Sequence, residues 1–116
     1  QAQGVRIIRI EEFFDRGVSD VMREVREIVG DQPTYCTYDI DFVDPAFAPG
    51  TGTPEVGGPN SFQALQVVRE LAGVQLVGAD LVEVSPPFDT NGNTAWLGAS
   101  ILFEMLCVSA GAISRR

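Results

Sequence analysis

Residues 37–45 read TYDIDFVDP, and the fold that the sequence predicts is built around this stretch. Apolar and β-branched residues lead into it, so we expect a strand over residues 35–40. Asp39 and Asp41 stand at the end of that strand, where alternating side chains point to the same face. Neighbouring carboxylates repel each other unless a cation or protons lie between them, and their oxygens suit Mg²⁺, Ca²⁺ or Mn²⁺. The pattern therefore indicates a metal site, with capping of the following turn by both aspartates as the alternative.

The rest of the chain alternates between strand patterns and helix patterns. We expect strands at residues 5–10, 35–40 and 74–84, and helices at residues 18–29, 61–72 and 94–108. This order favours an α/β fold in which a parallel sheet carries helices on its faces. The last helix is apolar nearly all round, which predicts that it is buried and that Trp96, Phe103 and Met105 pack in the core. Residues 109–116 are expected to form a loose tail.

The carboxyl ends of the predicted strands are the expected place for a ligand, as in other parallel α/β sheets. Asp39 and Asp41 lie at one such end and Glu83 lies at another, so three carboxylates from two strands should converge. A loop over residues 42–60 follows the aspartates, and loops of that length inside a compact domain are usually functional. An EF-hand calcium loop is excluded, because its sixth position would be Asp44 instead of glycine and its twelfth would lack glutamate.

Composition narrows the range of functions. The 116 residues suffice for one domain, the formal net charge is −8, and no basic stripe is present, so no nucleic-acid partner is expected. The chain contains no histidine and cannot supply a histidine ligand or base. Cys36 and Cys107 lie in apolar stretches and are expected to be buried, reduced thiols, as in the cytoplasm or an organelle. Residues 95–108 form the most apolar stretch, which is shorter than the roughly 20 residues of a bilayer span, so no membrane partner is expected.

A set of spaced residues resembles the signature of the ureohydrolases, the family of arginases, agmatinases and guanidino-acid hydrolases. The set comprises TYDID at 37–41, Pro45, Pro49, Gly50, Gly58, DLVEVSPP at 80–87 and NTA at 93–95. The stretch PGTGTPE at residues 49–55 is more similar to the agmatinase branch than to arginase proper. Because the resemblance spans nearly the whole chain, it is much more specific than a single short motif.

A remote alternative uses the same aspartates. Asp39, Asp41 and Val43 also fit the DxDx[TV] pattern of haloacid-dehalogenase-type phosphatases. In that interpretation Asp39 would be the nucleophile, Asp41 the general acid and base, and Mg²⁺ the cofactor. It leaves the loop after Pro45 unexplained, and the chain has no lysine to contact the phosphate.

The ureohydrolase resemblance implies a three-layer αβα fold with a mostly parallel sheet, of which residues 1–116 would be the C-terminal segment of a single domain. It implies two Mn²⁺ ions, with Asp39 bridging both and Asp41 binding one. It also implies that Glu83 receives the guanidinium of a small guanidino substrate, with Thr53 beside that pocket. The histidines and first metal half-site of the family have no counterpart here, so the segment alone is expected to be inactive.

The full-length protein is expected to be a homo-oligomer of the cytoplasm or of mitochondria that releases urea from its substrate. The competing interpretation is a non-catalytic fragment or interaction module that keeps the fold. Finding the upstream metal half-site would favour the enzyme, and its absence would favour the competing interpretation.

Overall fold

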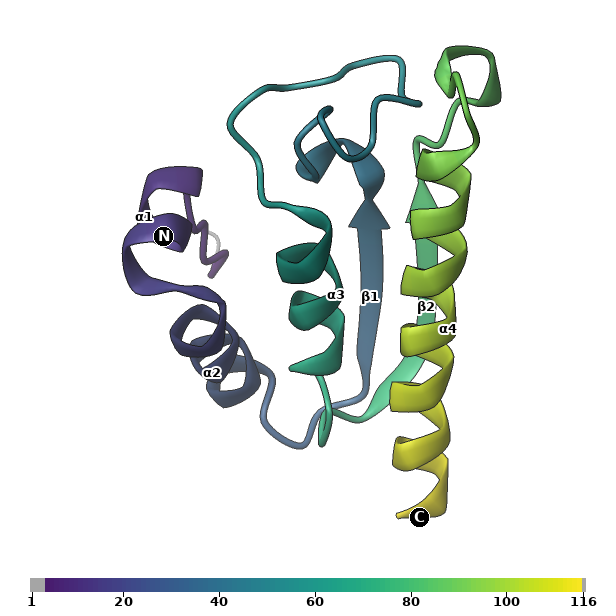
Figure 1. Ribbon diagram of the computed structural model, residues 1–116. Helices are drawn as coiled ribbons and strands as arrows, with labels where there is room; N and C mark the ends of the chain where they lie inside the picture. Colours follow the sequence, from purple (N-terminus) through teal and green to yellow (C-terminus); the bar gives the residue numbers. More distant parts are fainter. Residues whose placement is uncertain (1–3, 116) are drawn as a thin grey trace.

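The computed structural model describes residues 4–115, whose strands form one parallel two-stranded sheet (Figure 1). In chain order the elements are α1 (Ile10–Arg16), α2 (Val18–Val29), β1 (Thr34–Asp39), the 3₁₀ turn η1 (Ile40–Phe42), α3 (Ser61–Arg69), β2 (Leu76–Val82), the 3₁₀ turn η2 (Pro86–Phe88) and α4 (Asn93–Ser114). The strands predicted at residues 35–40 and 74–84 and the three predicted helices are present. The predicted alternation is therefore confirmed from residue 18 onward.

The two faces of the sheet differ in what covers them. β1 and β2 pair with Tyr38 opposite Leu81 and Asp39 opposite Val82. Tyr38 and Leu81 point into the core that α3 and α4 complete with Ala64 and other apolar side chains. The opposite face, here called the bare face, carries Tyr35, Thr37, Asp39, Gly78, Asp80 and Val82. Parallel sheets normally bury both faces, and the described part of the chain supplies a helical layer for one of them.

The helices begin and end where local chemistry dictates. α2 ends at Gly30, whose φ of 53° suits glycine, as the sequence predicts. α3 begins at Ser61, also as predicted, behind a capping box in which Asn60 Oδ1 accepts the N–H of Gln63 at 2.8 Å and Asn60 N donates to Gln63 Oε1 at 2.9 Å. In Figure 1, α3 runs beside β1 and α4 runs along β2, while α1 and α2 lie beyond α3.

The prediction of a strand at residues 5–10 is wrong. Residues 5–9 adopt no regular structure, and α1 begins at Ile10. A strand needs a neighbour, and within residues 4–115 β1 and β2 pair only with each other. The segment is instead fixed by Arg6, which lies 2.6 Å from a carboxylate oxygen of Glu12 and 2.6 Å from one of Glu24.

α4 is longer and less buried than predicted. It continues to Ser114, so the expected loose tail is helical to that point. Its packing against β2 and α3 buries Met105 but leaves Trp96 76% and Phe103 63% exposed, and their prediction as core residues is wrong. With 22 residues and an 18-residue stretch of mean hydropathy 1.7, α4 is by length and composition long and apolar enough to cross a membrane, because it extends beyond the apolar stretch predicted at residues 95–108. Here the buried stripe of α4 packs onto the sheet as one layer of an α/β domain.

The two cysteines also differ from each other. Both are free thiols, as expected, but Cys36 is half-buried on β1 whereas Cys107 is exposed on α4. The prediction of burial is therefore wrong for Cys107, which lies on the uncovered side of its helix. Burial raises the pKa of the Cys36 thiol.

Candidate functional site

Asp39 and Asp41 lie at the carboxyl end of β1, but strand alternation does not bring them together. Asp39 is the last residue of β1, whereas Asp41 lies in η1. Asp39 Oδ1 accepts the backbone N–H of Asp41 at 3.0 Å and so caps the 3₁₀ turn. A tight turn therefore places the two carboxyl groups side by side. Asp39 also does what the capping alternative predicts.

The pKa of the Asp39 carboxyl group depends on the groups around it. Partial burial raises the pKa of the Asp39 carboxyl group, and the carboxyl groups of Asp41 and Glu83 raise this pKa further, against the lowering effect of the Asp41 N–H. The ion pairs formed within residues 4–115 involve other acids and do not neutralise these three. The end of β1 and the end of β2 thus hold neighbouring like charges with no cation from the described chain.

Glu83 follows β2 in an unusual backbone conformation. Its φ is 74°, and in the described chain it is the one residue other than glycine with a positive φ. This left-handed conformation costs an L-residue about 1–2 kcal/mol, and such strain is concentrated at functional positions. Glu83 directly follows Val82, the pairing partner of Asp39, and its side chain is exposed. Glu83 forms no salt bridge to an arginine within residues 4–115.

Thr53 reaches the site from the long loop that arches over the carboxyl ends of the strands (Figure 1). Its Oγ1 donates a hydrogen bond to Asp41 Oδ2 at 2.6 Å. The structure thus places Thr53 against Asp41, whereas the family resemblance implies a place beside the guanidinium pocket of Glu83. The sequence contains no signal for this bond, because it joins residues of two irregular segments.

Two further acids hold the loop and the start of α4 in place. Asp44 accepts the backbone N–H groups of Ala46 and Gly57, each at 2.9 Å, and these bonds hold the pKa of Asp44 below its usual value. Asp89 accepts the N–H groups of Thr94 at 3.1 Å and Ala95 at 2.9 Å, which likewise lower the pKa of Asp89. The bonds of Asp44 make it a turn residue.

Two glycines allow the loop to approach its supports closely. Gly50 N donates to Thr94 Oγ1 at 2.8 Å, and a Cβ at position 50 would lie 2.6 Å from the Cβ of Asp89. A Cβ at Gly58 would lie 2.4 Å from the carbonyl oxygen of Phe42. Any larger residue at either position would push the loop away from the site.

Asp80 forms a cross-strand cluster on the bare face of the sheet. Its carboxylate accepts the hydroxyls of Tyr35 at 2.7 Å and Thr37 at 2.5 Å, and these bonds lower the pKa of Asp80. Thr37 and Asp80 are pairing partners, and Thr37 shares its face of β1 with Asp39. This cluster ties β1 to β2 just before the strands end. Sequence reasoning gave Asp80 no role, because strand register is needed to see its partners.

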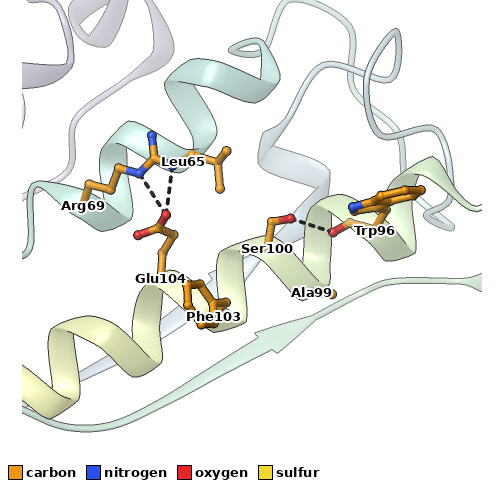
Figure 2. A pocket seen from close by; sticks show the side chains of 7 residues that line it. All are labelled: Leu65, Arg69, Trp96, Ala99, Ser100, Phe103 and Glu104. Atoms are coloured by element: carbon orange, nitrogen blue, oxygen red, sulfur yellow. Dashed lines mark hydrogen bonds and ion pairs between the residues drawn. The ribbon is translucent and has the colours of Figure 1, made fainter.

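A surface hollow of about 350 Å³ lies between α3 and α4 (Figure 2). Trp96 and Phe103 contribute to its lining together with Arg69 and Glu104, whose charged groups lie 2.9 Å apart. None of the acids at the strand ends lines it. Since its one acid is already paired with an arginine, the candidate site is the carboxyl edge of the sheet and not this hollow.

The acids at the strand ends suit a cation but do not enclose one. Asp39 and Asp41 offer carboxylate oxygens, which favour Mn²⁺, Mg²⁺ or Ca²⁺ over softer metals. Within residues 4–115 no group of three histidine, cysteine, aspartate or glutamate side chains is arranged to hold a metal ion. Two neighbouring carboxylates without a cationic partner fit part of a metal site, and further ligands would have to come from elsewhere.

Comparison with known proteins gives close matches along nearly the whole chain. A profile of the arginase family matches residues 1–107. The chain is 56% identical over 112 residues to guanidinopropionase and 53% identical over 113 residues to guanidinobutyrase, both of Pseudomonas aeruginosa. Each alignment covers 97% of this chain and 35% of the relative, so the chain spans about a third of the length of these relatives.

A solved structure extends the comparison to the fold. Proclavaminate amidino hydrolase from Streptomyces clavuligerus matches with a TM-score of 0.93 and 44% identity, over 96% of this chain and 37% of that one. This similarity confirms the predicted α/β fold class.

Proposed function

This chain belongs to the arginase family, and we propose that it is the C-terminal part of a binuclear manganese amidinohydrolase that releases urea from a small guanidino compound. The observation that carries the proposal is the meeting of Asp39, Asp41 and Glu83 at one sheet edge without a cationic partner from the described chain. The names of the relatives, guanidinopropionase and guanidinobutyrase, support a guanidino substrate. Family membership leaves no support for the phosphatase alternative, in which Asp39 would be a nucleophile.

Asp39 and Asp41 would hold manganese together with ligands from the rest of the full-length protein. Asp39 would bridge two ions and Asp41 would bind one. When bound, manganese supplies Lewis-acid activation of water at neutral pH. The contribution of the chain is to orient both carboxylates, through the Asp41 N–H on Asp39 and the Thr53 hydroxyl on Asp41.

Glu83 would bind the guanidinium group of the substrate. A carboxylate can accept two parallel N–H bonds from the planar guanidinium, which fixes the position of the central carbon. The strained backbone at Glu83 and its lack of an ion pair within residues 4–115 support a role that requires a free carboxylate at this point. Thr53 would lie beside the same pocket.

The competing proposal is a non-catalytic fragment that keeps the fold. It is favoured by the small share of a metal site that the chain carries, namely two of the ligands and no histidine. A calorimetric titration of the isolated 116-residue chain with Mn²⁺ is expected to show weak binding. A urea assay of the same chain is expected to show no urea release. Two tight manganese sites on the isolated chain would contradict the proposed division of the site.

We also propose that the full-length protein is a homo-oligomer of the cytoplasm or of mitochondria, with no nucleic-acid or membrane partner. The exposed apolar side chains of α4, among them Trp96 and Phe103, are compatible with burial against further protein. Light scattering of the full-length protein is the measurement that tests the oligomeric state.

The role of Glu83 is tested by Glu83→Gln in the full-length protein. We expect kcat/KM for its guanidino substrate to fall roughly 30-fold to several thousand-fold, because losing one partner of a close charge pair costs about 2–5 kcal/mol. Manganese content and melting temperature should stay normal. The matched control is Glu55→Gln, since Glu55 is an exposed acid of the loop. A Glu83→Gln protein with lower stability but unchanged kcat/KM would rule out the substrate role.

A further inference from the structure

Thr53 connects the long loop to the proposed metal ligands. Its Oγ1 lies 2.6 Å from Asp41 Oδ2. A threonine hydroxyl has one proton and an ionised carboxylate can only accept, so Thr53 is the donor. We infer that Thr53 is a positioning residue for Asp41, holding its carboxylate in one orientation so that it is ready to bind manganese. This inference rests on the proposed function, in which Asp41 is a metal ligand.

Asp41 requires such a partner because its backbone is fixed while its side chain can still rotate. The backbone N–H of Asp41 is bonded to Asp39 Oδ1 at 3.0 Å, and η1 sets the backbone conformation. The carboxylate itself retains rotation about its side-chain torsions, with a broad minimum for the terminal one. A hydrogen bond to Oδ2 removes much of that freedom before a metal binds. Partners of this kind typically contribute about 10- to 100-fold to metal affinity.

The loop presents Thr53 from between two anchors. On one side, Gly50 N donates to the buried Thr94 hydroxyl at 2.8 Å, and Gly50 O accepts the N–H of Ser85 at 2.7 Å. On the other side, Gly57 N donates to Asp44 Oδ2 at 2.9 Å. The Thr53 hydroxyl therefore reaches Asp41 from a short segment that is fixed at both ends. The β-branched side chain of threonine further restricts where that hydroxyl can point.

The bond to Asp41 leaves Thr53 able to contact the substrate as well. After donating its proton, the hydroxyl still has two lone pairs that can accept an N–H from a guanidinium. The bond to Asp41 and the contact with the substrate can be measured separately. Manganese affinity reports on the bond to Asp41, whereas KM at saturating manganese reports on contact with the substrate.

The test uses the full-length protein and measures manganese dissociation constants by titration of the metal-free form. Thr53→Val keeps the shape of the side chain but removes the hydroxyl, and it should weaken manganese binding at one site by about 10- to 100-fold. Thr53→Ser restores the hydroxyl and should recover most of the lost affinity. Thr90→Val is the matched control, because Thr90 is an exposed threonine between η2 and α4 with no assigned role. It should bind manganese like the wild type.

The outcomes distinguish this inference from the proposed function. Wild-type manganese affinity in Thr53→Val would overturn the inference whatever happens to KM, and so would an equal loss in Thr53→Ser. Asp41→Asn, measured in parallel, should lose one manganese ion per subunit. If Asp41→Asn loses that ion and Thr53→Val does not, only the inference about Thr53 fails. If Asp41→Asn binds both ions normally, the proposed role of Asp41 itself fails. Thr53 is exposed, so folding should be retained, and Thr53→Ala serves as a second variant without the hydroxyl.

Discussion

Two groups of acids occupy the same edge of the sheet and differ in what surrounds them. The anchor acids, Asp44 and Asp89, each accept two backbone N–H groups and thereby fix the loop and the start of α4. The site acids, Asp39, Asp41 and Glu83, accept few such bonds and lie close enough for Asp39 to be affected by the other two. The same residue types therefore serve stability in one place and are kept available for a ligand in the other.

The pKa directions express this difference. Backbone N–H groups lower the pKa of Asp44 and Asp89, so the charged form of each is stabilised by folding. Burial and neighbouring carboxyl groups raise the pKa of Asp39, so its charged form is destabilised. If no ligand bound here, a substitution that removed this repulsion would raise the stability of the folded protein. Locally unfavourable arrangements of charge such as this one are expected at functional sites.

The largest expected effect contrasts Asp39→Asn with Asp44→Asn in the full-length protein. Asp39→Asn should lower kcat/KM by roughly 1000-fold or more, because a lost metal ion removes several kcal/mol of transition-state stabilisation. Asp44→Asn should lower the melting temperature, because the two N–H groups bind different oxygens of Asp44 and the asparagine amide has an NH2 donor in place of one of them. Its folded fraction should keep near-normal kcat/KM for urea release. Equal activity losses in the two variants would remove the distinction between anchor acids and site acids.

A smaller effect concerns the strained backbone at Glu83. Replacement by glycine removes the cost of the left-handed conformation, so Glu83→Gly should raise the stability by about 0.5–1 kcal/mol after the added flexibility of the unfolded chain is subtracted. Glu83→Ala keeps the strain and should show no such gain. Both variants should lose urea release. The melting temperatures of the two variants provide the comparison, and a glycine variant no more stable than the alanine variant would show that Glu83 is not strained.

The smallest effect is the pH dependence of the anchor acid Asp44. Its pKa is lower in the folded state than in the unfolded state, where 3.8 is the ordinary value. The stability that Asp44 contributes is therefore fully present above pH 3.8 and is lost as the pH falls through its lower folded-state pKa. The difference in melting temperature between wild type and Asp44→Asn should be constant near neutral pH and shrink below pH 3.8. A difference that grows on acidification would contradict the assigned role of the two N–H groups.

The sequence predicts the central elements well because their signals are local. The β1 pattern and the helix starting at Ser61 each depend on residues within one short segment. The bond from Thr53 to Asp41 could not be predicted, because it depends on how the long loop folds back over the strand ends. The position of Asp41 in η1 was also missed, since strand alternation and a tight turn both place it near Asp39.

The errors share one physical origin. A strand at residues 5–10 and a fully buried α4 both presuppose neighbours that the described chain does not supply. Apolar patterns report which surfaces tend to be covered, but not by which polypeptide. The exposed Trp96 and the bare face around Tyr35 follow from the same cause, because the described chain forms a sheet with one helical layer.

The central claim is that the site acids hold manganese, and the number of Mn²⁺ ions bound per subunit of the full-length protein tests it most directly. Elemental analysis after dialysis should find two ions in the wild type and in Asp44→Asn. It should find at most one in Asp39→Asn, because the bridging carboxylate is gone. Two tightly bound ions in Asp39→Asn together with normal turnover would contradict the account.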